Sequence, residues 1–271
     1  MSHGTSFRPW WFLAVTFGWS WAFWWAAVWS GGSWRDPLPF VLFAVGGTGP
    51  LLSAVLLLRV AGRREDEVDF WRRLVGVRLL RPRWWVLVVV VALLPSVVGR
   101  AVTGGDGAGL GYGAPLVLAT AVVAGVLEEP GWRGYAVDAL SARHGAVPAA
   151  GIVGAAWALW HLPLFFLPGS YQHGLGAGST DFWLFLLNLL ALSFVYAAVY
   201  FITGRSILAV VVLHALANAP GELVSVSPAR GVETAVTLVL AAAAVLGLVR
   251  RARGRPDRDS GASGPAPVLG E

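Results

Sequence analysis

Long apolar runs separated by short polar segments repeat along the whole chain. A helix needs about 20 predominantly apolar residues to cross the roughly 30 Å hydrocarbon core of a bilayer. The pattern therefore predicts an all-α, polytopic membrane protein with about eight transmembrane helices. We expect these helices at residues 10–29, 38–60, 84–100, 115–136, 147–167, 182–202, 206–220 and 232–249.

The composition supports this interpretation and adds the domain organisation. Hydrophobic residues make up 56% of the chain and charged residues only 13%, whereas soluble domains carry about 25% charged residues. We expect a single transmembrane domain over 1–249, followed by a polar tail at 250–271 that is disordered and cytoplasmic. The first apolar run is long and lacks a small-residue cleavage site, which favours a retained helix over a cleaved signal peptide.

All 20 basic residues are arginines, and their distribution predicts the topology. If the N-terminus is cytoplasmic, 16 of them fall in cytoplasmic segments, only Arg35, Arg100 and Arg230 fall outside, and the remaining Arg133 lies at membrane depth. The positive-inside rule then places both termini on the cytoplasmic side of the cell membrane. The Arg-only, Ala-, Val- and Gly-rich composition suggests a bacterium with a GC-rich genome. Because topology accounts for the net charge of +5, we expect the lipid bilayer and no nucleic acid as a partner.

Two segments that connect the predicted spans have a composition that needs interpretation. Residues 61–83 mix charged with large apolar side chains, and both an interfacial amphipathic helix and a solvated charged loop fit this mixture. Residues 104–113 are glycine-rich, but a phosphate-binding loop requires a preceding strand. A nucleotide site is therefore not expected there.

Strongly polar side chains inside the apolar spans mark the candidate site. An ionisable group at bilayer depth costs from about 2.5 to more than 10 kcal/mol and usually serves a function. A spacing of four puts two residues on one helix face, so Glu129 can pair with Arg133, which leaves Glu128 free for chemistry. Each polar residue alone also fits a structural helix–helix contact, but together they favour a buried hydrolytic site. The residues lie on three spans: Glu128, Glu129 and Arg133; Trp157 and His161; His214 and Asn218.

These residues form three ordered motifs that resemble those of a known family. Glu128-Glu129-Pro-Gly-Trp-Arg133 resembles Glu-Glu-x-x-x-Arg, and His214-Ala-Leu-Ala-Asn218 resembles His-x-x-x-Asn. Trp157-x-x-x-His161 resembles Phe-x-x-x-His, with Trp in place of Phe, a change expected to affect only the packing beside His161. The family is that of the CPBP intramembrane proteases, also called the Abi or CAAX protease family, and the resemblance covers about 115–220.

The resemblance implies a CAAX-protease-like helical bundle with an intramembrane cavity, and an endopeptidase that acts on membrane-associated or lipidated peptides. It implies that Glu128 activates a water molecule that His161 helps to hold. It further implies that His214 and Asn218 stabilise the oxyanion, with Glu129, Arg133 and Trp157 in support. The substrate stays open between prenylated peptides, bacteriocin leaders and membrane-bound regulators, and the oligomeric state is not indicated.

The residue types that are present limit the choice of nucleophile and leave two possibilities for a metal. Cysteine is absent, and no serine stands in a nucleophile-elbow context, so activated water is the natural nucleophile. A zinc ion on Glu128, His161 and His214 would be a His₂Glu site with a position for water. A metal-free glutamate mechanism is preferred, because the sequence lacks a His-Glu-x-x-His arrangement.

Two other functional classes fit parts of the pattern. A proton-coupled transporter would distribute its acidic residues along a path through the membrane, whereas here they concentrate in three motifs. A non-catalytic membrane scaffold or immunity protein would not need the full set of motif residues. The endopeptidase interpretation is therefore preferred over both.

Overall fold

The computed structural model describes residues 8–77, 81–104, 114–223 and 229–253, and these residues form helices and turns without any strand. Side-chain positions at 114–117 and 221–223 lie outside this description. The elements are α1 (Pro9–Trp29), α2 (Pro37–Gly47), α3 (Gly49–Ala61), α4 (Arg64–Val75), α5 (Pro82–Thr103), α6 (Ala114–Glu129), the π-helix η2 (Pro130–Val137), α7 (Asp138–His144), α8 (Ala146–Trp160), the 3₁₀-helix η3 (Leu162–Phe166), α9 (Tyr171–Leu175), α10 (Thr180–Ile202), α11 (Ile207–Leu223) and α12 (Arg230–Arg253).

The prediction of an all-helical, polytopic membrane protein is confirmed, but the prediction of eight transmembrane helices is wrong for the described residues. Four helices are long and apolar enough to cross a bilayer: α5, α8 continued by η3, α10 and α12. A fifth span results if α2 and α3, which are bent by 43° relative to each other, are counted together.

The remaining predicted spans form helices that are less apolar, or have a shorter apolar part, than a membrane-crossing helix needs. Helix α1 has 21 residues, but seven are tryptophans, whose indole N–H makes them partly polar. Helix α6 ends at Glu129 and is followed by the charged η2, and the apolar part of α11 covers only Ile207–Pro220. Apolar character alone therefore overestimates the number of spans.

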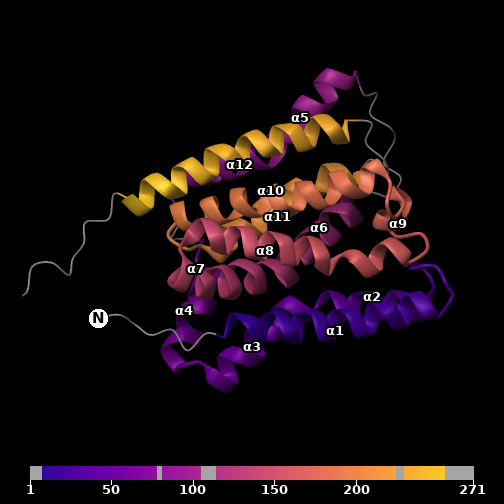
Figure 1. The fold of residues 1–271 in the computed structure, drawn as a ribbon, viewed down its shortest axis with the longest axis horizontal. Helices are drawn as coiled ribbons and strands as arrows, with labels where there is room; N and C mark the ends of the chain where they lie inside the picture. Colours follow the sequence, from indigo (N-terminus) through magenta and orange to yellow (C-terminus); the bar gives the residue numbers. More distant parts are fainter. Residues whose placement is uncertain (1–7, 78–80, 105–113, 224–228, 254–271) are drawn as a thin grey trace, which may run out of the picture.

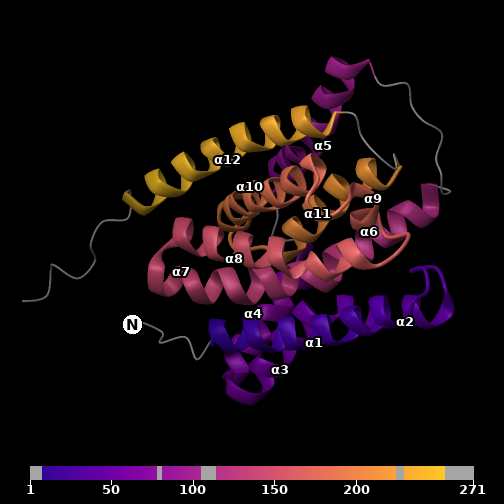
Figure 2. The same cartoon turned by 45° about the vertical axis from the view of Figure 1, so that its right-hand side comes forward.

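The helices form three groups that lie side by side (Figure 1). Helices α1, α2 and α3 lie on one side, α5 and α12 on the opposite side, and α6, α8, α10 and α11 lie between them; the rotated view in Figure 2 shows the same order. Glycines allow the central helices to approach closely, because a Cβ on Gly125 of α6 would lie 2.7 Å from the carbonyl oxygen of Val211 on α11. Small residues have this role at helix contacts in membranes.

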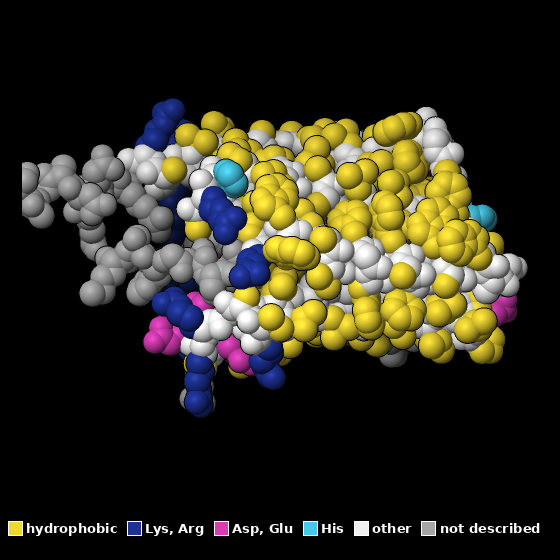
Figure 3. Space-filling model, turned by 60° about the horizontal axis from the view of Figure 1, so that its bottom comes forward, with side chains coloured by type: hydrophobic (Ala, Val, Ile, Leu, Met, Phe, Trp, Pro, Cys, Tyr) yellow, Lys and Arg dark blue, Asp and Glu magenta, His cyan; other side chains and the backbone are white. Residues whose placement is uncertain are grey.

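Apolar and basic side chains separate on the molecular surface. Hydrophobic side chains cover most of the visible face, while arginines and carboxylates gather at one end (Figure 3). The start of α1 and the end of α12 lie at the same end of the bundle (Figure 1). This arrangement agrees with the predicted topology, although which end faces the cytoplasm stays a prediction. Helix α12 continues to Arg253, so it includes the first residues of the predicted tail, and 254–271 lie outside the described residues.

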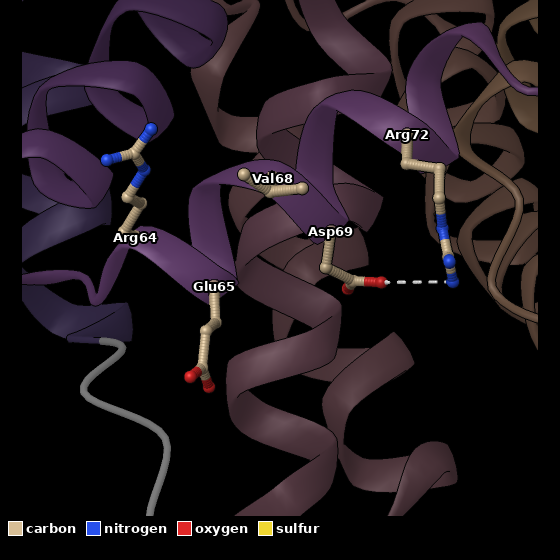
Figure 4. Close-up of a pocket in the computed structure, with 5 residues that line it drawn as sticks. All are labelled: Arg64, Glu65, Val68, Asp69 and Arg72. Atoms are coloured by element: carbon tan, nitrogen blue, oxygen red, sulfur yellow. Dashed lines mark ion pairs between the residues drawn. The ribbon is translucent and has the colours of Figure 1, made fainter.

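The segment 61–83 contains an amphipathic helix, α4, rather than only a charged loop. Phe70 is fully buried, and Arg73 is 4% exposed and pairs with Asp69 at 2.8 Å. On the outer face of α4, charged side chains surround a shallow pocket, with an ion pair between Asp69 and Arg72 at 3.9 Å (Figure 4). Further ion pairs join Asp138 of α7 to Arg73 and to Arg205. These contacts attach α4 to the Arg-rich end of the bundle.

Candidate active site

The two glutamates lie at the point where the helix geometry changes. Helix α6 ends at Glu129, and the next eight residues form the π-helix η2, all of them buried. Pro130 has no amide N–H and cannot continue the α-helical hydrogen-bond pattern, which accounts for an irregularity directly after the glutamates. Short π-helical segments occur often at functional sites.

Glu129 is the centre of a buried ionic group. Its Oε1 accepts a hydrogen bond from Nη1 of Arg133 at 2.8 Å and lies 2.7 Å from Nδ1 of His214. The predicted contact between Glu129 and Arg133 is therefore present. The contact with His214 comes from another helix, α11, and no spacing in the sequence indicates it.

Arg133 packs against two aromatic rings. Its guanidinium carbon is 4.4 Å from the ring centre of Trp157 and 4.7 Å from that of Tyr196. Cation–π attraction is strong in a desolvated setting, so the rings help to stabilise a fully buried charge. Tyr196 on α10 was not predicted as a site residue, and its phenol group is not a distinctive signal, because the same helix also contains Asn188, Ser193 and Tyr200.

Glu128 faces a different helix from Glu129. Neighbouring residues point about 100° apart around a helix, and Oε2 of Glu128 accepts a hydrogen bond from the indole N–H of Trp157 on α8 at 2.6 Å. The expectation that Trp157 changes only the packing beside His161 is therefore wrong. An indole donates a hydrogen bond that a phenyl ring cannot donate.

The tautomer of His161 follows from its partner. Nδ1 of His161 lies 2.8 Å from the carbonyl oxygen of Trp157. A carbonyl oxygen only accepts, so Nδ1 carries the hydrogen and Nε2 of the neutral ring is an acceptor. The ring also packs edge-on against Trp160 and Phe185, with ring centres 4.9 Å and 5.5 Å away.

Asn218 lies one helical turn after His214 on α11 and is partly exposed. Among the described residues, no polar contact joins it to the other predicted site residues. Five of the predicted polar residues are thus brought together around Trp157, namely Glu128, Glu129, Arg133, His161 and His214. We call these five residues the polar cluster.

The polar cluster does not form a recognisable metal site. Within the described residues, no group of three or more His, Asp or Glu side chains is arranged to hold a metal ion. Glu128 turns one oxygen towards Trp157, and Nδ1 of His214 faces Glu129. As placed, Glu128, His161 and His214 do not fit a zinc ion, and the zinc alternative stays an untested prediction.

Comparisons with known proteins match the segment that carries these residues. Residues 111–220 match the sequence model of the type II CAAX prenyl endopeptidase Rce1-like family. The protein CAAX prenyl protease 2 of Methanococcus maripaludis is 29% identical over 216 residues, which cover 74% of this chain and 79% of that protein. The matched segment contains all three motifs, from Glu128 to Asn218. Both matches confirm the resemblance that the motifs predict: the chain is similar to CPBP-family proteases.

Proposed function

We propose that the chain is an intramembrane endopeptidase in which Glu128 and His161 activate a water molecule. The observation that carries this proposal is a difference in exposure within the polar cluster. Glu129 and Arg133 are 0% exposed and paired with each other, whereas Glu128 and His161 each retain 8% exposure. Each of the latter two uses one polar atom for a protein contact, which leaves Oε1 of Glu128 and Nε2 of His161 as acceptors.

A water molecule between these two acceptors is prepared for attack. It donates one hydrogen bond to Oε1 of Glu128 and one to Nε2 of His161, so that its oxygen lone pair faces the substrate carbonyl carbon. During attack one water proton passes to Glu128, and the carbonyl oxygen becomes an oxyanion. The C–N bond then breaks, and Glu128 returns the proton to the leaving amine, which gives a carboxylic acid and an amine.

His214 and Asn218 are the proposed donors to the oxyanion. Nδ1–H of His214 donates to Glu129, so Nε2 carries a second N–H when the ring is an imidazolium. Glu128 and Glu129 carry two negative charges, which Arg133 and an imidazolium at His214 balance. The amide group of Asn218, one turn further along α11, supplies the second donor. Donors of this kind contribute about 2.7–4 kcal/mol each to transition-state stabilisation.

The proposed substrate is a peptide held at the membrane. The names of the matched family and of the Methanococcus relative refer to CAAX prenyl substrates, so a lipidated peptide with the scissile bond near its C-terminus is the first candidate. The apolar surface of the bundle supports this choice (Figure 3), because a lipid-anchored peptide reaches a site between helices by moving within the bilayer.

The test is cleavage of quenched fluorescent peptides, lipidated and unlipidated, by the purified full chain in detergent, with and without a chelator. We expect the wild type to cleave lipidated peptides, and Glu128→Gln and His161→Ala to reduce cleavage to background. Cleavage that both variants retain would overturn the mechanism. If the wild type cleaves no peptide and both variants keep full function in cells, the protein is a non-catalytic membrane scaffold.

A further inference from the structure

Trp157 contacts four members of the polar cluster through its indole N–H, its backbone carbonyl and its ring. Its indole N–H donates to Glu128 at 2.6 Å, and its backbone carbonyl accepts from His161 at 2.8 Å. One ring face covers the guanidinium of Arg133, and the ring centre lies 5.6 Å from that of His214. The side chain is 2% exposed, so these contacts are shielded from solvent.

We propose that Trp157 is a positioning residue for the catalytic glutamate Glu128, a role that rests on the proposed function. The N–H holds Oε2 of Glu128, and this fixes the rotation of the carboxylate so that Oε1 points to the same water as Nε2 of His161. The backbone carbonyl of the same residue sets the tautomer of His161. One residue thereby orients both groups that hold the water.

The motif of the resembled family has Phe at this position, and Phe lacks the N–H. The inference therefore concerns this chain and not the family motif. A side chain that only filled space would not need a donor, and a buried indole N–H without a partner occurs close by. Nε1 of Trp160, which is also 2% exposed, has no hydrogen-bond partner among the described residues.

Trp160 therefore supplies a matched control. Trp157 and Trp160 lie on the same helix, have the same burial, and pack against His161 with ring centres 6.1 Å and 4.9 Å away. Trp→Phe removes the same atoms at both positions. Only at 157 does it also remove a hydrogen bond to a carboxylate.

The first experiment compares Trp157→Phe with Trp160→Phe in the full chain, by measuring kcat and KM for a peptide that the wild type cleaves. Hydrogen bonds to charged groups are among the stronger ones in proteins. We expect Trp157→Phe to lower kcat about 10- to 100-fold with KM within about twofold, and Trp160→Phe to lower kcat by at most about threefold. Equal losses of kcat in the two variants would overturn the proposal, because packing would then explain both.

A second variant separates the N–H from the ring. Replacement of Trp157 by 3-benzothienylalanine keeps the shape of the side chain and exchanges N–H for sulfur. We expect this analogue at 157 to reproduce the loss of kcat seen in Trp157→Phe, and the same analogue at 160 to have little effect. Wild-type kcat with the analogue at 157 would show that the N–H has no positioning role.

A stability measurement keeps the inference testable if no peptide is cleaved. Thermal unfolding in detergent is compared for Trp157→Phe, Glu128→Leu and the double variant. If the hydrogen bond is present, the double variant loses less stability than the sum of the two single losses. Additive losses of stability would exclude the hydrogen bond between Trp157 and Glu128. Non-additive losses without any peptide cleavage would support this hydrogen bond and count against the proposed function alone.

Discussion

Substitution of Gly125 by alanine should reduce activity without changing any polar side chain. Gly125 lies where α6 approaches α11 closely, one turn before Glu129. A Cβ at this position would lie 2.7 Å from the carbonyl oxygen of Val211 and 3.5 Å from Cβ of His214, whereas an ordinary contact is at least 3.4 Å. The two helices must therefore separate by about 0.7 Å to accept the methyl group.

This separation acts directly on the ionic group that spans the same two helices. The contact between Glu129 and His214 is 2.7 Å long, and a hydrogen bond weakens steeply beyond about 3.2 Å. A misplacement of about 1 Å costs up to about 100-fold in rate, so we expect a loss of about 10-fold or more in kcat/KM. Stability should fall by at most about 2 kcal/mol, because overpacking costs about 1–3 kcal/mol and the gain in helix propensity from Gly to Ala offsets about 1 kcal/mol.

The assay is the peptide cleavage described above, together with thermal unfolding in detergent. Gly151→Ala is the matched control, because its Cβ would meet only Phe194 of α10 at an ordinary 3.5 Å. Full activity of Gly125→Ala would refute the reasoning, since it would show that the close approach of α6 and α11 does not position His214. An equal loss in both variants would point to a general effect of the methyl group.

Three further predictions concern the buried ion pair, the attachment of α4 and the role of a metal. Arg133→Met leaves Glu129 buried without its arginine partner and should lower the stability by about 3–5 kcal/mol in thermal unfolding. As a control, Arg59→Met breaks the exposed ion pair of Arg59 and Glu67 and should cost less than about 1 kcal/mol. Equal losses of stability in the two variants would count against a buried ion pair. Phe70→Ala removes the fully buried side chain that attaches α4 and should lower the free energy of unfolding by about 3–5 kcal/mol. It should also make α4 susceptible to limited proteolysis. Unchanged proteolysis would show that Phe70 does not anchor α4. A strong chelator should leave peptide cleavage unchanged if water is activated by Glu128 and His161 alone, and inhibition reversed by zinc would instead support a metal site.

The sequence predicted contacts within helices better than contacts between helices. Glu129 and Arg133 are four residues apart on one helix, and their pairing follows from helix geometry. His214 was assigned to a face shared with Asn218, and its contact with Glu129 could not be foreseen. That contact depends on how α6 and α11 are rotated relative to each other, which apolar patterns in a membrane specify poorly because most faces are apolar.

The number of spans was predicted less well, for a related reason. Apolar character located every predicted span on a helix, but it did not show the 43° bend between α2 and α3 or the short apolar part of α11. For 61–83 the sequence left two possibilities. The burial of Phe70 and Arg73 in α4 depends on the neighbouring helices, and it favours the amphipathic helix over a solvated loop.

The different roles proposed for two adjacent glutamates follow from the helices that surround them. Two neighbouring carboxylates in one apolar setting repel each other, so their different contacts distinguish them. Here Glu129 contacts Arg133, whose positive charge stabilises it in full burial, and His214, while Glu128 points towards α8 and receives one neutral N–H. Oε1 of Glu129 contacts both Arg133 and His214 in full burial, whereas the single hydrogen bond to Oε2 of Glu128 leaves its Oε1 as an acceptor. The neighbours on α8 and α11 therefore give the two glutamates different surroundings, which supports the proposal of Glu128 as the base and Glu129 as the group that orients His214.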